Sequence, residues 1–370
     1  MSARIRVLVT PKDENPYQRL LYEEIAAAGA EIRYLDGPSR SQTLNLLVAP
    51  LMLMRHRILG YRILHIHWTF QFSLPWAPRS LMARRVMQRW FWLYLWWADT
   101  LGYRIVWTAH DLLPHDQVFS DDREARQYLI GRADAVIALS GASAEDLIAL
   151  GATGVQVIPL GSYVEPYRTV LEAQEARQAL GVIAGDVVVL LIGKIERYKG
   201  ADLLLEAAAS LPPSSPIKVI IAGACSDAAY RATIFELAAR AGERAMVRLE
   251  RIPEEEMTTY LDAADFAAFP FREVTNSSSV LLAQSFGLPV LIPNLTSLRD
   301  VPEEAVLRYD PIGQGLVEAL ERASRLTEEI RADMGRVAKR HANTMNWPTA
   351  ARLHLETYVA LLNELGRVNS

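Results

Sequence analysis

The stretch Val187-Val-Val-Leu-Leu-Ile-Gly-Lys-Ile-Glu-Arg-Tyr-Lys-Gly200 decides the fold class of this 370-residue chain. Its first six residues are all aliphatic, as in a β-strand that is buried on both faces. Gly193 and Gly200 bracket a short loop, and residues 201–210 then have apolar residues at helical spacing. Strand, loop and helix in this order predict an α/β protein with a mostly parallel sheet.

The same order of elements recurs along the whole chain. Strands are expected before this stretch at residues 5–10, 31–35, 63–67, 104–108, 135–139 and 155–159, and after it at residues 218–222, 247–249, 266–269 and 289–292. Residues 160–184 are polar and helical, so they are expected to join two domains. The sequence therefore predicts two doubly wound, Rossmann-like domains that face each other across a cleft. A single large α/β domain is the alternative.

The predicted domain boundaries follow from this connection. Residues 1–165 form an N-terminal domain and residues 166–345 a C-terminal domain. Residues 346–370 begin with Asn-Trp-Pro-Thr, where Pro348 suits the first turn of a helix. This last helix is expected to cross back to the N-terminal domain.

The composition excludes several classes of protein. The 43 acidic and 39 basic side chains give a net charge of −4, which argues against a general nucleic-acid binder. The single cysteine, Cys225, excludes an internal disulfide framework and fits a reducing cytosol. The N-terminal apolar run is too short for a signal peptide, and no apolar stretch reaches the roughly 18 residues of a membrane span. The motif G-x-G-x-x-G is missing after the first strand, which disfavours a nicotinamide enzyme.

The loop after residues 187–192 has residues suited to phosphate binding. Gly193 lets a ligand approach the backbone, while Lys194 and Lys199 place two cations at a strand end. Two ammonium groups suit a diphosphate, whose negative charge grows as a sugar leaves it. Solvated lysines in a turn are the alternative.

A second loop, Phe269-Pro-Phe-Arg-Glu-Val-Thr-Asn-Ser-Ser-Ser-Val280, leads into a predicted helix. Asn276, Ser277, Ser278 and Ser279 are of types favoured at a helix start, where backbone N–H groups and the helix dipole attract phosphate. Such a start often caps only its own helix. Together with the lysine loop of the same domain, it predicts a donor site.

The order G-K-x4-K-G, I-A-G-A, this serine-rich loop and G-L-P-V resembles the nucleotide-sugar domain of GT-B glycosyltransferases. The resemblance is strongest over residues 187–292 and points to the large retaining family of bacterial mannosyl- and glucosyltransferases, the glycosyltransferase group 1 type. It implies that Lys194 and Lys199 contact the donor diphosphate, and that backbone amides from Ser277 to Ser279 hold the phosphates. It also implies that no metal or other cofactor is needed, because these groups take its role.

One feature departs from the family pattern. The family usually has two glutamates eight residues apart, the second just inside the helix that precedes G-x-P-V. Counting back from Gly287 places Leu282 at the second position, and Glu273 lies one residue from the first. Glu273 is expected to bind ribose or sugar hydroxyls, whereas the missing second carboxylate leaves retention or inversion of configuration open.

The predicted catalytic residues are His110, Asp111 and Lys199. His110 and Asp111 directly follow the strand at residues 104–108, where an imidazole can bind a sugar hydroxyl and a carboxylate can act as base toward an acceptor. The resemblance likewise places a histidine at this strand end in the active site. Capping of the following turn is the alternative for this pair.

The acceptor is expected to lie against the N-terminal domain. Glu14 follows the first strand, and His67 ends another. Alternation places His65 and His67 on one sheet face, with His67 nearer the cleft. Their spacing permits a metal site, but no cysteine or acidic residue lies near them in the sequence, so no metal is predicted.

Residues 37–98 have no Asp or Glu but contain eight arginines, among them Arg84, Arg85 and Arg89. The same span holds the run Trp90-Phe-Trp-Leu-Tyr-Leu-Trp-Trp97. Arginines beside tryptophans and leucines are typical of a surface among lipid headgroups, and each basic residue near an anionic leaflet contributes about 1 kcal/mol. A buried core helix with solvated arginines is the alternative.

These features predict a membrane-associated glycosyltransferase of the cytoplasm, peripherally bound to the inner face of the plasma membrane. It is expected to move a hexosyl group from a nucleotide diphosphate sugar (GDP-mannose or a UDP-sugar) to a lipid-linked or exopolysaccharide-precursor acceptor, as in glycolipid or polysaccharide biosynthesis. The alternatives are a nucleotide-sugar binding protein without turnover and a UDP-sugar epimerase. No nucleic-acid partner is expected.

Overall fold

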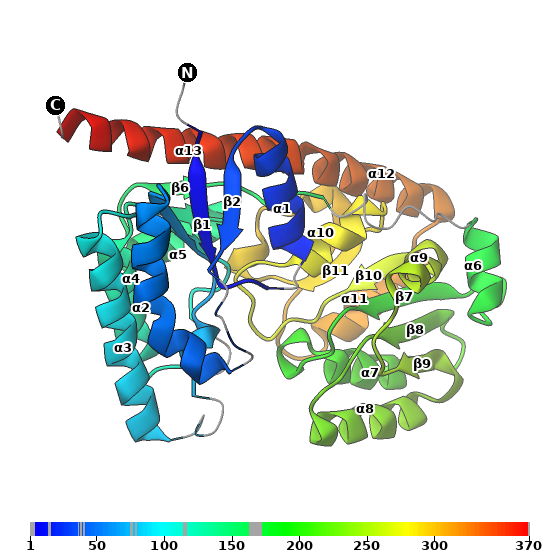
Figure 1. Ribbon diagram of the computed structural model, residues 1–370. Helices are drawn as coiled ribbons and strands as arrows, with labels where there is room; N and C mark the ends of the chain where they lie inside the picture. Colours follow the sequence, from blue (N-terminus) through cyan, green and yellow to red (C-terminus); the bar gives the residue numbers. More distant parts are fainter. Residues whose placement is uncertain are drawn as a thin grey trace. The chain divides into compact units, whose positions relative to one another are not determined.

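The computed structural model describes residues 4–13, 16–35, 37, 39, 41–74, 77, 80–113, 117–162 and 172–368. The chain divides into two compact units (Figure 1). Unit 1 comprises Met1–Gly161 together with Asn346–Ser370, and unit 2 comprises Ser162–Met345. Each unit has one six-stranded sheet in which all paired strands are parallel, so the prediction of two doubly wound α/β domains is confirmed.

The sheet of unit 1 has the strand order β2-β1-β3-β4-β5-β6. Its strands are β1 (Arg6–Thr10), β2 (Glu31–Tyr34), β3 (Ile63–Ile66), β4 (Arg104–Ala109), β5 (Ala135–Ala138) and β6 (Val155–Val157). Its helices are α1 (Pro16–Ala27), α2 (Gln42–Ile58), α3 (Leu81–Thr100), α4 (Asp122–Arg132), α5 (Gly141–Ala149) and α13 (Trp347–Val368). The order reverses between β1 and β3, and such a switch point is where doubly wound sheets bind ligands.

The sheet of unit 2 has the order β12-β11-β10-β7-β8-β9, with its reversal between β7 and β10. Its strands are β7 (Val187–Ile192), β8 (Ile217–Ala222), β9 (Ala245–Arg248), β10 (Phe266–Ala268), β11 (Val290–Pro293) and β12 (Val306–Tyr309). Its helices are α6 (Ala173–Ala179), α7 (Ala201–Ser210), α8 (Ala228–Ala241), α9 (Glu254–Ala263), α10 (Ser278–Ser285), α11 (Gly315–Arg325) and α12 (Glu328–Thr344). All six residues of β7 are buried, as an aliphatic strand between two helical layers requires.

The main differences from the sequence-based expectation concern three strands, of which β9 covers residues 245–248 instead of 247–249. Strand β12 was not expected, because Val306–Tyr309 is a partly exposed edge strand interrupted by Arg308. The strand expected at residues 155–159 ends at residue 157, since it is also a short edge strand. None of the helices in the described part of the chain combines the length and apolar character of a membrane span.

The aromatic run at residues 90–97 does not form a single surface. It lies in α3, where the helical period turns Phe91, Tyr94 and Leu95 into the core of unit 1. Only Leu93 and Trp96 of the run are exposed. The expected membrane contact through the whole run is therefore wrong for its core-facing residues.

Candidate active site

The loop after β7 brings the backbone of unit 2 close to other groups. Gly193 has a φ of +111°, and a Cβ atom there would lie 3.4 Å from Nζ of Lys199. Gly200 has a φ of +70°, and a Cβ there would lie 2.0 Å from the carbonyl oxygen of Pro270. Glycine at these positions allows the β7 loop to pack against the loop that precedes α10.

Lys199 points into the protein from this loop. It is only 7% exposed, and its Nζ donates a hydrogen bond to Oγ of Ser279 at 3.2 Å. Burial lowers the pKa of Lys199 to about 8; Glu196 opposes this shift and Lys194 adds to it. A partly dehydrated ammonium of this kind gains more from a bound anion than a fully solvated one does.

Lys194 has different surroundings. Its side chain is largely exposed and forms an ion pair with Glu196. Exposed pairs contribute little to stability, so a ligand anion can compete for this cation at small cost. The two lysines thus share one loop, but only Lys199 is held in a fixed position.

The helix α10 starts at the second predicted phosphate loop. The Ser277 hydroxyl accepts a hydrogen bond from the Val280 N–H at 3.1 Å and so caps the helix. Ser278 and Ser279 lie in the first turn, whereas Asn276 is half-buried before the cap and Glu273 is exposed. The cap occupies one of the four N–H groups that a helix start leaves without an intrahelical partner. The serine-rich start therefore caps its own helix and also receives the Lys199 ammonium.

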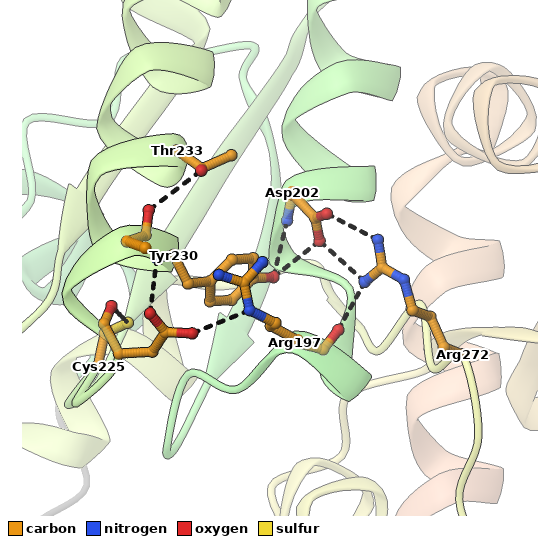
Figure 2. A network of polar contacts seen from close by, with 8 residues as sticks. Arg197, Asp202, Cys225, Tyr230, Thr233 and Arg272 are labelled. Atoms are coloured by element: carbon orange, nitrogen blue, oxygen red, sulfur yellow. Dashed lines mark hydrogen bonds and ion pairs between the residues drawn. The ribbon is translucent and has the colours of Figure 1, made fainter.

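An ionic network connects the β7 loop to the loop before α10 (Figure 2). Arg272 contacts both carboxylate oxygens of Asp202 at 2.7 and 3.0 Å and donates to the Arg197 carbonyl at 2.5 Å. The Tyr230 hydroxyl donates to Asp202 at 2.7 Å, and the Arg197 guanidinium lies 4.8 Å from the centre of the Tyr230 ring. A bidentate arginine–carboxylate pair is directional, so this pair fixes the spacing between the two loops.

Residue 282, where the family usually has its second glutamate, is a leucine in this chain. Leu282 is half-buried and packs against the apolar core of unit 2. Two residues later, buried Gln284 has its Oε1 3.0 Å from Nδ1 of His341. Position 282 therefore belongs to the packing of unit 2.

A row of hydrogen-bonded histidines lies in unit 1, at β3 and the end of β4. Nε2 of His110 lies 3.0 Å from Nδ1 of His67, and Nε2 of His67 lies 2.6 Å from the Tyr22 hydroxyl. The same hydroxyl lies 2.8 Å from Nδ1 of His65, which also contacts the Tyr358 hydroxyl at 2.7 Å. The row joins His110 to α1 and α13 through side chains that are almost fully buried.

Burial keeps these imidazoles neutral at pH 7. It lowers the pKa of His110 to about 3 and holds the pKa values of His65 and His67 well below their usual value. When two neutral imidazoles are joined Nδ1 to Nε2, one nitrogen must donate and the other must accept. His67 and His110 therefore carry their protons on the same ring position, both on Nδ1 or both on Nε2. The single Tyr22 proton, directed to His65 or to His67, selects between these two states.

Aromatic rings fix the plane of the His110 imidazole. The Trp68 ring stacks on it with centres 4.1 Å apart, and the Tyr17 ring meets it edge-on at 4.7 Å. Tyr17 in turn packs at 5.4 Å against Trp347, the first residue of α13. The C-terminal helix thus supports the histidine row from within unit 1.

Asp111 lies beside a buried cation. Burial lowers the pKa of Arg126 to about 10, and the charges of Asp111 and Asp122 oppose that shift. Arg126 also lies 4.8 Å from the centre of the Trp107 ring. Asp111 is half-buried within the electrostatic reach of this guanidinium, whereas Glu14 lies outside the described residues.

The predicted site residues thus fall into two groups, with Lys199 and Ser279 together in unit 2 and His67 and His110 together in unit 1. Sequence reasoning missed Tyr22, Asp202 and Arg272, since neither spacing nor residue type distinguishes them from ordinary helix and loop residues. Within the described part of the chain, no group of three or more His, Cys, Asp or Glu side chains is placed to hold a metal ion.

Comparison with known proteins gives consistent matches for both units. Residues 172–341 match the family model of the glycosyl transferases group 1, and residues 86–164 match that of Glycosyltransferase Family 4. The chain is 27% identical to the D-inositol 3-phosphate glycosyltransferase of Corynebacterium urealyticum, over 83% of this chain and 73% of that protein.

Solved structures share the fold at low sequence identity. Sucrose-phosphate synthase from Thermosynechococcus elongatus has a TM-score of 0.77 at 19% identity, over 98% of this chain and 100% of that one. HepE of Anabaena in complex with UDP has a TM-score of 0.72 at 17% identity, over 96% of this chain and 100% of that one.

Proposed function

We propose that this chain, of which residues 172–341 match the glycosyl transferases group 1 model and which has the GT-B fold, moves a hexosyl group from GDP-mannose or a UDP-sugar to an acceptor bound by unit 1. Unit 2 binds the donor. The named relatives are glycosyltransferases, which favours transfer over binding without turnover and over epimerisation.

The observation that carries the proposal is the contact between Lys199 and Ser279. It places a buried cation at the start of α10, beside the reversal of strand order in the sheet of unit 2. A diphosphate at this place would receive the Lys199 charge and the backbone N–H groups of the helix start together. Lys194 adds a second positive charge from the surface, and Glu273 is the candidate for ribose or sugar hydroxyls.

The chemistry follows from these charges. As the glycosidic bond of the donor breaks, negative charge grows on the leaving diphosphate, and fixed cations stabilise that state more than the ground state. No metal is needed for this step in the proposal. In unit 1, a neutral His110 with its proton on Nε2 would accept a hydrogen bond from the acceptor hydroxyl through Nδ1, and Asp111 is the second candidate for this role.

Helix α2 supports a lipid-linked acceptor through its outward face. Its core stripe consists of Leu46, Ala49, Leu53 and His56. The opposite stripe, at alternating spacings of three and four residues, is also apolar and is 40–79% exposed: Leu44, Leu47, Leu51, Met54 and Ile58. A helix that is apolar on both sides is unusual at a surface in contact with water.

Helix α3 repeats this arrangement beside α2 (Figure 1). Its outward stripe is also largely apolar and includes one arginine: Met82, Val86, Arg89, Leu93 and Trp96. Arg85 is exposed next to it, whereas Arg84 contacts Gln117 at 2.5 Å. We refer to these two stripes with Arg85 as the α2–α3 face.

The proposed partner of the α2–α3 face is an anionic membrane, with the enzyme held peripherally at the inner leaflet. Large exposed apolar patches on single chains usually mark interaction sites. Exposed arginines in a span without Asp or Glu match negatively charged headgroups. The acceptor would then be a lipid-linked sugar or polysaccharide precursor at that surface.

A phosphorylated polyol is the second candidate acceptor. The observation that favours it is the name of the relatives, which are D-inositol 3-phosphate glycosyltransferases. This acceptor would require no membrane, so the two candidates separate in one assay.

The test is release of nucleoside diphosphate from GDP-mannose, UDP-glucose and ADP-glucose, each with anionic vesicles carrying lipid-linked acceptors or with D-inositol 3-phosphate. Release that depends on the vesicle-bound acceptor supports the proposal. Release only with inositol phosphate would replace the acceptor class. No donor bound and no release under any condition would contradict the donor assignment. The anomeric configuration of the product then decides between retention and inversion.

A further inference from the structure

Two pockets lie next to each other in unit 1 and share Leu46 of α2 as a lining residue. The first has a volume of about 420 Å³, lies between α2 and α3 within the α2–α3 face, and is lined mainly by apolar side chains. Leu47, Val86 and Leu93 line it and are 45–61% exposed, so it opens to the outside. Its volume lies in the range of about 300–1,000 Å³ that is usual for small-ligand sites.

A hydrogen bond between α2 and α3 holds the lining of the apolar pocket in place. The Trp90 indole N–H donates to the Leu46 carbonyl at 3.2 Å, and Trp90 lines the apolar pocket itself. Arg89, which is exposed, is the one charged side chain among the described residues that line this pocket. An arginine beside an apolar pocket is suited to a ligand that has an alkyl chain and an anionic group at its end.

The second pocket has a volume of about 240 Å³ and reaches the carboxyl end of β1. Among the described residues of its lining, Lys12 is the one that carries a charge, and Gln42, Asn45 and Gln71 add amide groups. Oε1 of Gln71 is buried without a hydrogen-bond partner, while its Nε2 donates to Thr10 at 3.3 Å. An unpaired buried acceptor costs free energy unless a ligand donor satisfies it.

From these two pockets we infer a single amphiphile site: the apolar pocket holds one alkyl chain of the acceptor lipid, and the polar pocket holds its phosphate and adjoining hydroxyls. Lys12 would contact the phosphate, and the amide groups of the lining would hydrogen-bond to the hydroxyls. This inference rests on the proposed lipid-linked acceptor. It goes further, because it assigns one bound alkyl chain to each protein molecule instead of general adsorption to a bilayer.

The test measures binding of decyl phosphate and decyl maltoside to the full chain by calorimetry, below their micellar concentrations and without donor. Val86→Trp fills the apolar pocket, and Leu51→Trp places the same side chain on the outward stripe of α2, away from the pocket lining. Both positions are more than half exposed, so both variants are expected to fold. Lys12→Ala tests the polar pocket.

We expect saturable binding of one decyl phosphate per chain, about tenfold weaker in Val86→Trp and nearly unchanged in Leu51→Trp, since only the first removes the buried contact area. Lys12→Ala should weaken decyl phosphate but not decyl maltoside. Equal losses in both tryptophan variants, or no saturable binding by the parent chain, would overturn the inference. So would a dimer in light scattering that either tryptophan variant dissociates, because a second copy would then cover the face. If the amphiphile binds as expected but no lipid acceptor is glycosylated, the pocket assignment holds and the proposed acceptor fails.

Discussion

The ammonium group of Lys199 lies 3.2 Å from the hydroxyl of Ser279, although 80 residues separate them in the chain. The contact joins the loop after β7 to the start of α10 and brings a buried cation to a helix N-terminus. Both groups favour anions, so their combined effect is larger at this point than in either loop alone.

The charge of Lys199 predicts a pH dependence of donor binding. With a pKa of about 8, Lys199 loses its proton as the pH rises from 7 to 9, so the affinity for a nucleoside diphosphate should fall over this range. Lys199→Arg keeps its charge throughout and should show no such fall. Calorimetric titration with GDP and UDP measures both, and a parallel decline in the arginine variant would assign the effect to another group.

The same pKa has a consequence for stability. The folded-state pKa of Lys199 is lower than the unfolded value of 10.5, so the unfolded chain binds more protons between about pH 8 and 10.5. Burying the charged Lys199 therefore lowers the free energy of unfolding by its full amount below pH 8. This loss is relieved, and the free energy of unfolding rises, as the pH increases from about 8 to 10.5.

Arg272 and Asp202 are expected to position the donor loops. Arg272→Met should weaken nucleotide binding about tenfold, because the loop before α10 loses its bidentate anchor on α7. The stability loss should stay near 1 kcal/mol, since the Arg272 side chain is 41% exposed. Arg352→Met, which breaks an exposed pair with Glu356 in α13, is the matched control and should leave nucleotide binding unchanged. Equal affinities in the two variants would remove the positioning role.

The histidine row predicts coupled tautomers. In ¹⁵N-histidine spectra, His67 and His110 should both be neutral at pH 6 and should carry their protons on the same ring position. Tyr22→Phe removes the hydroxyl that selects the state, so the His110 signals should become those of a tautomer mixture, and kcat should fall about tenfold with little change in KM. Tyr103→Phe, which removes a buried hydroxyl bonded to the Leu53 carbonyl, serves as control. Unchanged His110 signals in Tyr22→Phe would show that Tyr22 does not reach His110.

The α2–α3 face predicts salt-sensitive membrane binding. Replacing Arg85 and Arg89 by Ala should lower co-sedimentation with anionic vesicles several-fold, because each basic residue contributes about 1 kcal/mol near such a surface. Binding of the parent chain should decrease as the salt concentration rises from 0.1 to 0.5 M. The Debye length is about 10 Å at 0.1 M and shortens with added salt, which screens the attraction between the arginines and the headgroups. Replacing the exposed residues Arg240 and Arg340 of unit 2 by Ala is the control. Equal binding of both double variants, or none by the parent chain, would contradict membrane contact through this face.

Local patterns in the sequence were sufficient for much of the fold and for part of the site. The aliphatic run of β7 and the glycines after it identify a buried strand and its loop, because these signals lie within a few neighbouring residues. Lys199 and the serines of α10 are candidates for the donor site on equally local signals. The edge strand β12 was missed because half-exposed edges carry a weaker apolar pattern.

The remaining features depend on contacts between distant segments. Tyr22, His65 and Tyr358 meet only because α1, β3 and α13 pack together in unit 1. The pairing of Asp202 with Arg272 similarly requires the fold, since 70 residues separate them. In the run at residues 90–97, every residue is aromatic or leucine, so polarity does not distinguish the core-facing from the exposed side of α3.

The most direct measurement is release of nucleoside diphosphate from the preferred donor by the parent chain, Lys199→Ala and Lys339→Ala. Lys339 is an exposed lysine of α12 and controls for loss of charge from unit 2. Lys199→Ala should retain the fold by circular dichroism and lose at least about a hundredfold in kcat/KM, since a fixed charge on the leaving group contributes several kcal/mol. Lys339→Ala should match the parent chain. Full activity in a folded Lys199→Ala protein would contradict the assignment of Lys199 to the leaving diphosphate.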